Sequence, residues 1–272
     1  MFNIICYTTA MNQWSRNRKR IIFFIIVLAL IILVGAPLFF LFYRAPACID
    51  KKQNGDETGV DCGGSCQLLC TAESLPLILK GDPRVLEIKD NTFEIVALME
   101  NSNTSGEIYR AKYTFKLYGA TSTIPIKIVE GETYVPRGTT FALFEGPLTF
   151  EEGVVPTRAV LEWKEESLVW QKNLKETPEF VVKGAQLSRE DTSPRLDATI
   201  ENVSLESISN IDIVALISDE TGSIFAASKT FIDILPVGGS APVVFTWPKV
   251  FSHQVLNTEI IVRIFPDRSF IR

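Results

Sequence analysis

The chain has 272 residues, of which 46% are apolar, and a formal net charge of −5. An apolar share of this size can build a sizeable core and excludes a wholly disordered chain. The charges are unevenly placed, because residues 1–43 contain four bases and no acid, which leaves 23 bases against 32 acids in the rest. The part of the chain after residue 43 is therefore acidic and lacks the clustered lysines and arginines that neutralise phosphates. This excludes nucleic acid as a partner.

Residues 21–43 form an uncharged run, IIFFIIVLALIILVGAPLFFLFY. As a helix this run would span roughly 35 Å, enough to cross a hydrocarbon core of about 30 Å. The basic run RNRKR lies directly before it, at residues 16–20. This positive flank predicts that residues 1–20 are a cytoplasmic tail and that the chain after the helix lies outside the cytoplasmic membrane. We therefore predict a single-pass membrane anchor.

Two other interpretations place a cleavage or lipidation site after the apolar run. Ala45-Pro46-Ala47 has the small-x-small pattern of a signal-peptide cleavage site, but the run is longer than the roughly 7–15 apolar residues of a signal peptide. Acylation of Cys48 is less favoured, because Ala45 rather than leucine stands three residues before it. We expect an uncleaved anchor. Met11 is an alternative start; if the preceding residues are present, Cys6 is a cytoplasmic free thiol.

Residues 44–75 are predicted to form a cysteine-rich collar between the anchor and the ectodomain. Outside the cytoplasm disulfides persist, and an even number of cysteines in a short, glycine-rich stretch predicts two of them. The sequence leaves their three possible connectivities open. Zinc binding and redox catalysis are less favoured, because the C-x-x-C pairs typical of both are missing. The predicted disulfide cysteines are Cys48, Cys62, Cys66 and Cys70.

Acidic side chains are interleaved with these cysteines and offer the hard oxygen ligands that calcium prefers. Their spacing does not follow the register of an EF-hand loop, and a tight turn at Asn54-Gly55 with solvated acids is the favoured interpretation. We therefore predict no metal and no cofactor, with a calcium site as the alternative. The calcium candidates are Asp50, Asp56, Glu57 and Asp61.

The segment NGDETGVDCGGSCQLLC, residues 54–70, carries a family resemblance. Together with Cys48 it resembles a small cysteine module of bacterial surface and secreted proteins, approximately C-x-D-G-x-x-N-G-D-E-T-G-V-D-C-G-G-x-C-x-x-C. The segment departs from this pattern at Lys51, where the module usually has glycine, and by one extra residue before Cys70. The resemblance implies an extracytoplasmic stalk or spacer and no particular chemistry.

Short apolar runs and turns rich in Gly, Pro, Asn and Asp alternate from about residue 76 onward. In AKYTFKL, residues 111–117, apolar and polar side chains alternate, and RLDATIEN, residues 195–202, shows the same period of two. This period is typical of half-buried strands. Since no helical period is sustained after the membrane segment, the predicted fold class is an all-β ectodomain built of immunoglobulin-like sandwiches.

The ectodomain also repeats itself, with matching landmarks 100–103 residues apart. The landmarks pair Lys80-Gly81 with Lys183-Gly184, Glu100-Asn101 with Glu201-Asn202, and Pro136 with Pro236. This repeat predicts two tandem β-sandwiches, at residues 76–172 and 178–272. We expect the two to be separate beads that project roughly 60–80 Å from the membrane.

Residues 115–118 of the first repeat read Phe-Lys-Leu-Tyr and precede Gly119, and Pro136-Arg137-Gly138 follows further on. These segments resemble the FxLYD-type domain, an immunoglobulin-like sandwich of bacterial envelope proteins, whose naming motif usually has Asp where Gly119 stands. The second repeat keeps only the layout. The resemblance implies an immunoglobulin-like fold in a bacterial envelope setting, without shared catalytic residues.

The sequence offers little chemistry. His253 is the chain's one histidine, and no G-x-S-x-G elbow, phosphate loop or second histidine accompanies it. We therefore predict that the protein is not an enzyme, with an envelope hydrolase as a disfavoured alternative. The candidate binding residue is Trp247, which precedes Pro248 in a segment expected at a strand edge.

These features predict a non-enzymatic, single-pass membrane protein that displays two binding or spacer domains outside the cytoplasmic membrane. The expected partners are the membrane itself and an envelope or extracellular protein of unknown identity. The alternative is an accessory subunit of an envelope assembly for secretion, pilus formation or division. The sequence does not name the ligand.

Overall fold

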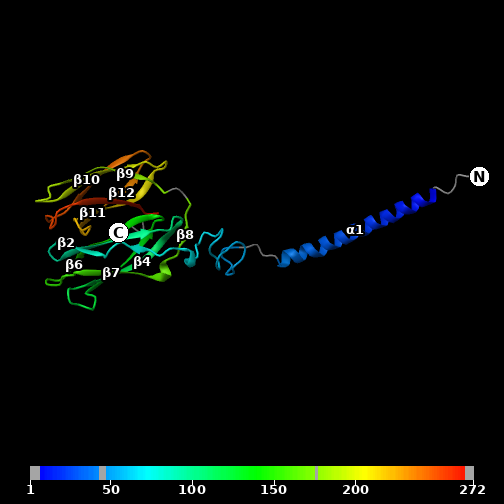
Figure 1. The fold of residues 1–272 in the computed structure, drawn as a ribbon, viewed down its shortest axis with the longest axis horizontal. Coiled ribbons are helices and arrows are strands. Elements are labelled where there is room, and N and C mark those ends of the chain that lie inside the picture. Colours follow the sequence, from blue (N-terminus) through cyan, green and yellow to red (C-terminus); the bar gives the residue numbers. More distant parts are fainter. Residues whose placement is uncertain (1–6, 43–46, 175–176, 267–272) are drawn as a thin grey trace, which may run out of the picture.

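The computed structural model describes residues 7–42, 47–174 and 177–266 (Figure 1). Several features predicted above lie outside these residues: Cys6, the end of the apolar run at Tyr43, the first two residues of Ala45-Pro46-Ala47, and the last residues of the second repeat. The described chain consists of one long helix, a loop-rich collar and an all-β ectodomain.

The helix α1 runs from Tyr7 to Phe42 and is the predicted membrane segment extended toward the N-terminus. Its apolar window, Asn17–Phe39, has a mean hydropathy of 3.2, and none of it is buried against the rest of the protein. Pro37 lies inside the helix. Within the part of the chain that the structure describes, α1 alone is long and apolar enough to cross a membrane.

The first β-sandwich consists of two antiparallel sheets. Sheet 1 contains β4 (Gly106–Tyr118) at its centre, with β5 (Lys127–Val135), β7 (Arg158–Trp163) and β8 (Gln171–Lys172) as its neighbours. Sheet 2 contains β3 (Thr92–Asn101) at its centre, with β1 (Ile78–Leu79), β2 (Arg84–Lys89) and β6 (Thr139–Thr149) as its neighbours. Two short 3-10 helices, Thr71–Glu73 and Glu165–Ser167, interrupt the connections.

The second β-sandwich has the same two-sheet plan. Sheet 3 contains β11 (Ile208–Ser218) between β12 (Ile224–Leu235) and β14 (Asn257–Ile264). Sheet 4 contains β10 (Arg195–Asn202) between β13 (Ser240–Thr246) and β9 (Phe180–Ser188). The fold class predicted from the sequence, two tandem sandwiches after a single apolar helix, is confirmed.

Each sandwich closes over its own apolar core, and the alternating strands supply it as expected. On β10, Leu196, Ala198 and Ile200 are buried while the intervening side chains are partly exposed. On β4, Phe115 and Leu117 of the Phe-Lys-Leu-Tyr segment are fully buried in the first core. The period of two therefore marks the inner face of these strands correctly.

A buried asparagine stands at the same place in both sandwiches. The side-chain amide of Asn101 donates to the carbonyl oxygens of Gly106 and Pro136, at 2.8 Å each. The side-chain amide of Asn202 donates to the carbonyl oxygens of Glu206, at 2.8 Å, and of Pro236, at 3.1 Å. Each asparagine thus satisfies carbonyls of two turns at one end of its sandwich, and the pair is a structural counterpart of the sequence repeat.

The two sandwiches are not separate beads. Figure 1 shows the second sandwich, in yellow to red, lying along the first, in cyan to green. The outer face of sheet 2 packs against the outer face of sheet 3 through a third apolar cluster. Its buried members are Leu86, Val96, Ala142, Val214, Leu216, Ala227 and Ile261. The ectodomain is therefore a stack of four sheets, and the expectation of two beads in line is wrong, because both facing sheets carry apolar side chains on their outer faces as well.

Candidate functional site

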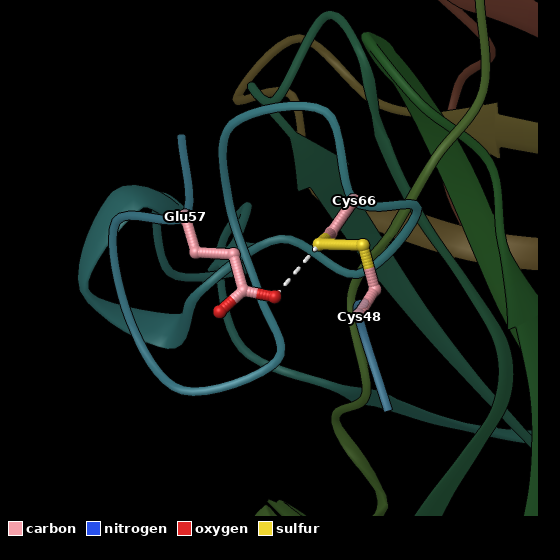
Figure 2. Close-up of side chains that lie close together, drawn as sticks. All are labelled: Cys48, Glu57 and Cys66. Carbon is pink, nitrogen blue, oxygen red and sulfur yellow. Dashed lines mark hydrogen bonds between the residues drawn. A yellow bond between two sulfur atoms is a disulfide. The ribbon is translucent and has the colours of Figure 1, made fainter. Parts of the chain in front are cut away.

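The collar is held by two disulfides, Cys48–Cys66 and Cys62–Cys70. Figure 2 shows the first of them with the carboxylate of Glu57 beside it. Cys48, Glu57 and Cys66 are the one group of three potential metal ligands within 4.8 Å of one another in the described residues. Because the two sulfur atoms are bonded to each other, neither is a thiolate, and the group cannot hold zinc in this state.

Glu57 lies against the disulfide for a structural reason. Its Oε1 is 3.3 Å from the Cys66 Sγ, the approach drawn as a dashed line in Figure 2. A disulfide sulfur carries no hydrogen, so this approach is a packing contact rather than a hydrogen bond. The other oxygen, Oε2, accepts the backbone N–H of Asn54 at 3.0 Å, which fixes the carboxylate. Glu57 therefore holds the turn at Asn54 close to the Cys48–Cys66 disulfide.

The other three calcium candidates also have protein donors. Both carboxylate oxygens of Asp61 accept the backbone N–H of Lys51 at 3.0 Å. Asp50 accepts the side-chain amide of Asn54 at 2.8 Å, and Asp56 accepts the hydroxyl of Ser65 at 2.8 Å. The Ser65 hydrogen bond lowers the pKa of Asp56. These carboxylates tie the turns of the collar together, and the structure does not bring the four into one ligand group among the residues it describes.

Glycine is required at two points of the collar by close contacts. A Cβ at Gly59 would lie 2.8 Å from the Cys70 Sγ and 2.9 Å from the Cys62 Sγ. Gly64 has a φ of +49°, and a Cβ there would lie 2.0 Å from the backbone oxygen of Asp56. Gly59 thus lets the backbone pass directly over the Cys62–Cys70 disulfide, and Gly64 lets it pass close to the backbone of Asp56.

The collar is docked onto one end of the first sandwich. The backbone N–H of Leu69 donates to Trp170 at 3.1 Å, and that of Lys172 donates to Gln67 at 2.7 Å. The Asn103 side chain accepts the N–H of Leu75 at 2.7 Å and donates to its carbonyl at 2.8 Å. We call this end of the ectodomain, where the collar attaches, the proximal end, and the opposite end the distal end.

We expect the Cys62–Cys70 disulfide to control the order of the collar. The collar has almost no apolar core apart from its disulfides. Replacing Cys62 and Cys70 together by serine should therefore cost about 2 kcal/mol of local stability, the low end for so short a loop. Hydrogen exchange of residues 59–70 measures this as faster exchange, while the cores of the sandwiches stay protected. Ser65→Ala, which keeps both disulfides, is the control; equal exchange in both variants would contradict the expectation.

A buried ion pair lies where the two sandwiches meet. Arg263 on β14 and Asp212 on β11 face each other in register, with Nη2 and Oδ2 3.3 Å apart and both side chains only 7% exposed. Nη1 of Arg263 donates to the hydroxyl of Thr133 at 3.1 Å, across to the first sandwich. The guanidinium also lies over the ring of Phe141. Burial lowers the pKa of Arg263, and the charge of Asp212 opposes this effect.

A polar cavity of about 320 Å³ opens beside this pair. Its charged groups are largely paired with each other: Arg110 with Glu132 at 2.6 Å, and Arg263 with Asp212. The phenol of Tyr113 donates to Glu145 at 2.6 Å. An arrangement of mutually satisfied charges holds strands in place and leaves little free chemistry for a substrate.

Glu94 is an exception to this pairing. It lies on the outer face of β3, and a Cβ at Gly146, which lines the cavity, would be 2.7 Å from its Cγ. The buried Oε2 of Glu94 has no hydrogen-bond partner among the described residues. Burial raises the pKa of this carboxyl to about 7, against the opposing charge of Lys229 on β12. Glu94 therefore titrates near neutral pH at the contact between the sandwiches.

Trp247 and His253 lie in a loop at the distal end. Trp247 is only 5% exposed, and its indole N–H donates to the carbonyl of Ala227 at 2.8 Å, so it is part of the second core and not an exposed binding platform. His253 is exposed, with its Nδ1 2.8 Å from the hydroxyl of Ser252. The strand β13 ends at Thr246, and the side chain of Trp247 packs into the second core against the ring of Phe251.

The interface residues were not predicted from the sequence, although signals for them exist. Arg263 is a single charge in the apolar run IIVRIF, and Asp212 is a single charge in ISNIDIVALI. Opposite charges embedded in two apolar strands indicate a buried pair, because an unpaired buried charge is costly. Glu94 shares the outer face of β3 with Val96, and this apolar neighbour is the signal that the face is covered.

Comparisons with known proteins add no family. No protein-family model matches the chain, and no curated protein matches it. Among solved structures, red sea bream transglutaminase is similar over 74% of this chain, with 9% sequence identity and a TM-score of 0.23. The chain spans 31% of the length of that transglutaminase. A likeness at this level carries no argument about activity.

Proposed function

We propose that the protein is a non-enzymatic, single-pass membrane protein of a bacterial envelope that holds a rigid, two-sandwich body outside the cytoplasmic membrane. The helix α1 would be the anchor, with the basic residues before it in the cytoplasm. The observation that carries the proposal is the unbroken packing from the collar through the first sandwich to the second. An ectodomain packed in this way presents one continuous surface to a partner.

The connection between the two sandwiches supports this rigidity. The carbonyl of Asn173, just before the second sandwich, accepts Nη1 of Arg137 at 2.8 Å. The Asn173 amide donates to Glu107 at 2.9 Å, and the phenol of Tyr134 donates to the same carboxylate at 2.6 Å. Burial and the carboxylate of Glu107 raise the pKa of Tyr134. The linker is therefore tied to the first sandwich at its start.

The distal end is where a partner would bind in this proposal. Both sandwiches direct inter-strand loops to this end, as immunoglobulin-like domains do where they recognise ligands. Lys249, in the loop after β13, forms ion pairs with Glu87 on β2 at 3.1 Å and with Asp90 in the turn after β2 at 3.2 Å, which connect the two sandwiches at this end. Exposed apolar side chains, among them Ile124 and Val250, offer contact area there. The resemblance of the collar to a bacterial cysteine module and of the first repeat to FxLYD-type domains supports the envelope setting.

Protease protection in a bacterial host tests the anchor and its orientation. We expect protease added to spheroplasts to digest the ectodomain completely and to leave a short membrane-bound fragment that contains α1. Spheroplasts opened by detergent should lose the tail as well. A fully protected ectodomain would overturn the orientation, and a released, soluble ectodomain before protease is added would overturn the uncleaved anchor.

A photo-crosslinking amino acid at Ile124 or Val250 tests the binding role. We expect a discrete envelope protein to be captured from these distal positions and not from Val244, which is exposed in the middle of β13. Capture that is equal at all three positions, or none at any, would contradict a distal binding surface and leave the body as a spacer.

A further inference from the structure

The turn at residues 203–206 of the second sandwich exposes apolar side chains at the proximal end. Leu205 is 93% exposed, and Val203 is exposed beside it. Val237 is exposed in the neighbouring turn, which is held next to the first by a hydrogen bond from Gly238 to Asn202 at 3.1 Å. We call Val203, Leu205 and Val237 the proximal apolar tip.

The tip is built as a fixed structure. The buried Asn202 donates to the carbonyls of Glu206 and Leu235, at 2.8 and 3.1 Å. Its side-chain oxygen accepts the backbone N–H of Ser204 at 3.0 Å. The Val203 N–H donates to the carbonyl of Glu179 at 3.1 Å. Leu205 is therefore displayed by a turn whose backbone is satisfied on both sides.

The equivalent turn of the first sandwich carries polar side chains instead of apolar ones. Counting from the matching asparagines, Ser102 and Thr104 stand where the second sandwich has Val203 and Leu205. The first turn is polar and is contacted by the collar through Asn103. The second turn thus presents apolar side chains where the first turn is polar, which makes it a candidate contact surface.

The proximal apolar tip lies at the end of the ectodomain from which the chain leads back to α1. Residues 43–47 separate the end of α1 at Phe42 from Cys48, and even fully extended they let the collar stand only roughly 20 Å from the helix end. The collar is in turn docked at the same end of the ectodomain as the tip (Figure 1). Exposed acids, Glu179 and Glu206, flank the tip, so its attraction is apolar rather than directed at anionic groups.

We propose that the proximal apolar tip inserts into the interface of the bilayer that holds α1, giving the ectodomain a second membrane contact. The inference rests on the proposed function, because it needs α1 to be a membrane anchor. The anchor keeps the tip at a high effective concentration next to the lipid, so a few apolar side chains suffice for contact. The ectodomain then stands tilted, with the second sandwich nearest the membrane.

The test uses full-length protein in phosphatidylcholine vesicles. An environment-sensitive fluorophore is attached at Leu205→Cys, in a Cys6→Ser background and without reductant, so that the collar disulfides do not react. Leu256→Cys, exposed next to Ser218 at the distal end, is the matched control. With quencher-labelled lipid, we expect quenching at position 205 to exceed that at position 256 by at least about twofold, as for side chains that enter the headgroup region.

The experiment distinguishes failure of membrane contact by the tip from failure of α1 as a membrane anchor. Vesicle flotation with equal quenching at both positions overturns membrane contact by the tip while the anchor stands. A blue-shifted fluorophore at position 205 that lipid quenchers do not reach also overturns it, because the tip is then covered by protein. Failure of the unlabelled protein to float with vesicles overturns the anchor itself. The variant Val203→Ser with Val237→Ser should reduce the quenching at position 205 while flotation stays unchanged.

Discussion

Replacing Asp212 by alanine is expected to lower the free energy of unfolding by about 3–5 kcal/mol, because the guanidinium of Arg263 is then buried without a counter-charge. The effect should appear first at the contact between the sandwiches, since Arg263 also holds Thr133 of the first sandwich. Urea unfolding of the protein in detergent, followed by tryptophan fluorescence, measures the change in free energy. Hydrogen exchange on β14 and β5 shows whether the contact opens.

Two variants give this experiment its controls. Asp197→Ala removes an acid from the exposed Arg195–Asp197 pair and should change the stability little, because solvent screens that pair. Asp212→Leu combined with Arg263→Met replaces the buried pair by apolar side chains and should recover most of the lost stability. If Asp212→Ala costs no more than Asp197→Ala, the interface pair is not desolvated and the sandwiches do not depend on it.

Replacing Glu94 by glutamine is expected to stabilise the protein by about 2–3 kcal/mol at pH 8 and to change little at pH 4. The pKa of this carboxyl is about 7 in the folded protein, against 4.5 without the fold. Between these values the folded state keeps a proton that the unfolded state releases. The wild-type protein therefore loses stability as the pH rises from about 4.5 to about 7, and glutamine, which cannot ionise, removes this loss.

The pH dependence of the difference between wild type and variant is the measurement, since other groups titrate in both proteins. Glu100→Gln is the matched control, because hydrogen bonds from Lys80 and Ser102 lower the pKa of Glu100 and its replacement should act in the opposite direction. A gain from Glu94→Gln that is the same at pH 4 and pH 8 would show that the carboxyl is not desolvated at the interface.

The sequence predicts the position and the buried face of a strand well where one face is buried and the other is exposed to solvent. On β10, apolar and polar side chains alternate, and the buried face follows that alternation residue by residue. On β11 the run Ile211–Ser218 is buried throughout, because one face fills the second core and the other meets the first sandwich. A strand without alternation indicates cover on both faces. The unbroken apolar run of β11 therefore predicts packing between the two repeats, in contrast to the expectation of separate beads.

The candidate sites were less predictable, for reasons of geometry. Cysteine spacing allows three pairings, and which sulfur atoms meet depends on the path of the whole loop, which in the structure joins Cys48 to Cys66 and Cys62 to Cys70. Trp247 is expected at a strand edge because Pro248 follows it, yet its side chain is buried in the second core, since the direction of a side chain at a strand end depends on the sheet opposite. The Arg263–Asp212 pair requires knowledge of the register between β14 and β11, which no short segment of sequence specifies.

The four-sheet stack has a consequence for the order in which the chain folds. The first sandwich is synthesised before the second, and its sheet 2 then exposes Val96, Leu98 and Phe144 on a face that sheet 3 covers later. Until β14, the last strand among the described residues, has been synthesised, sheet 3 is incomplete and that apolar face has no full cover. A chain truncated before β14 therefore presents an uncovered apolar face that favours aggregation, so that completion of the second sandwich, rather than folding of the first alone, is the step that protects the chain.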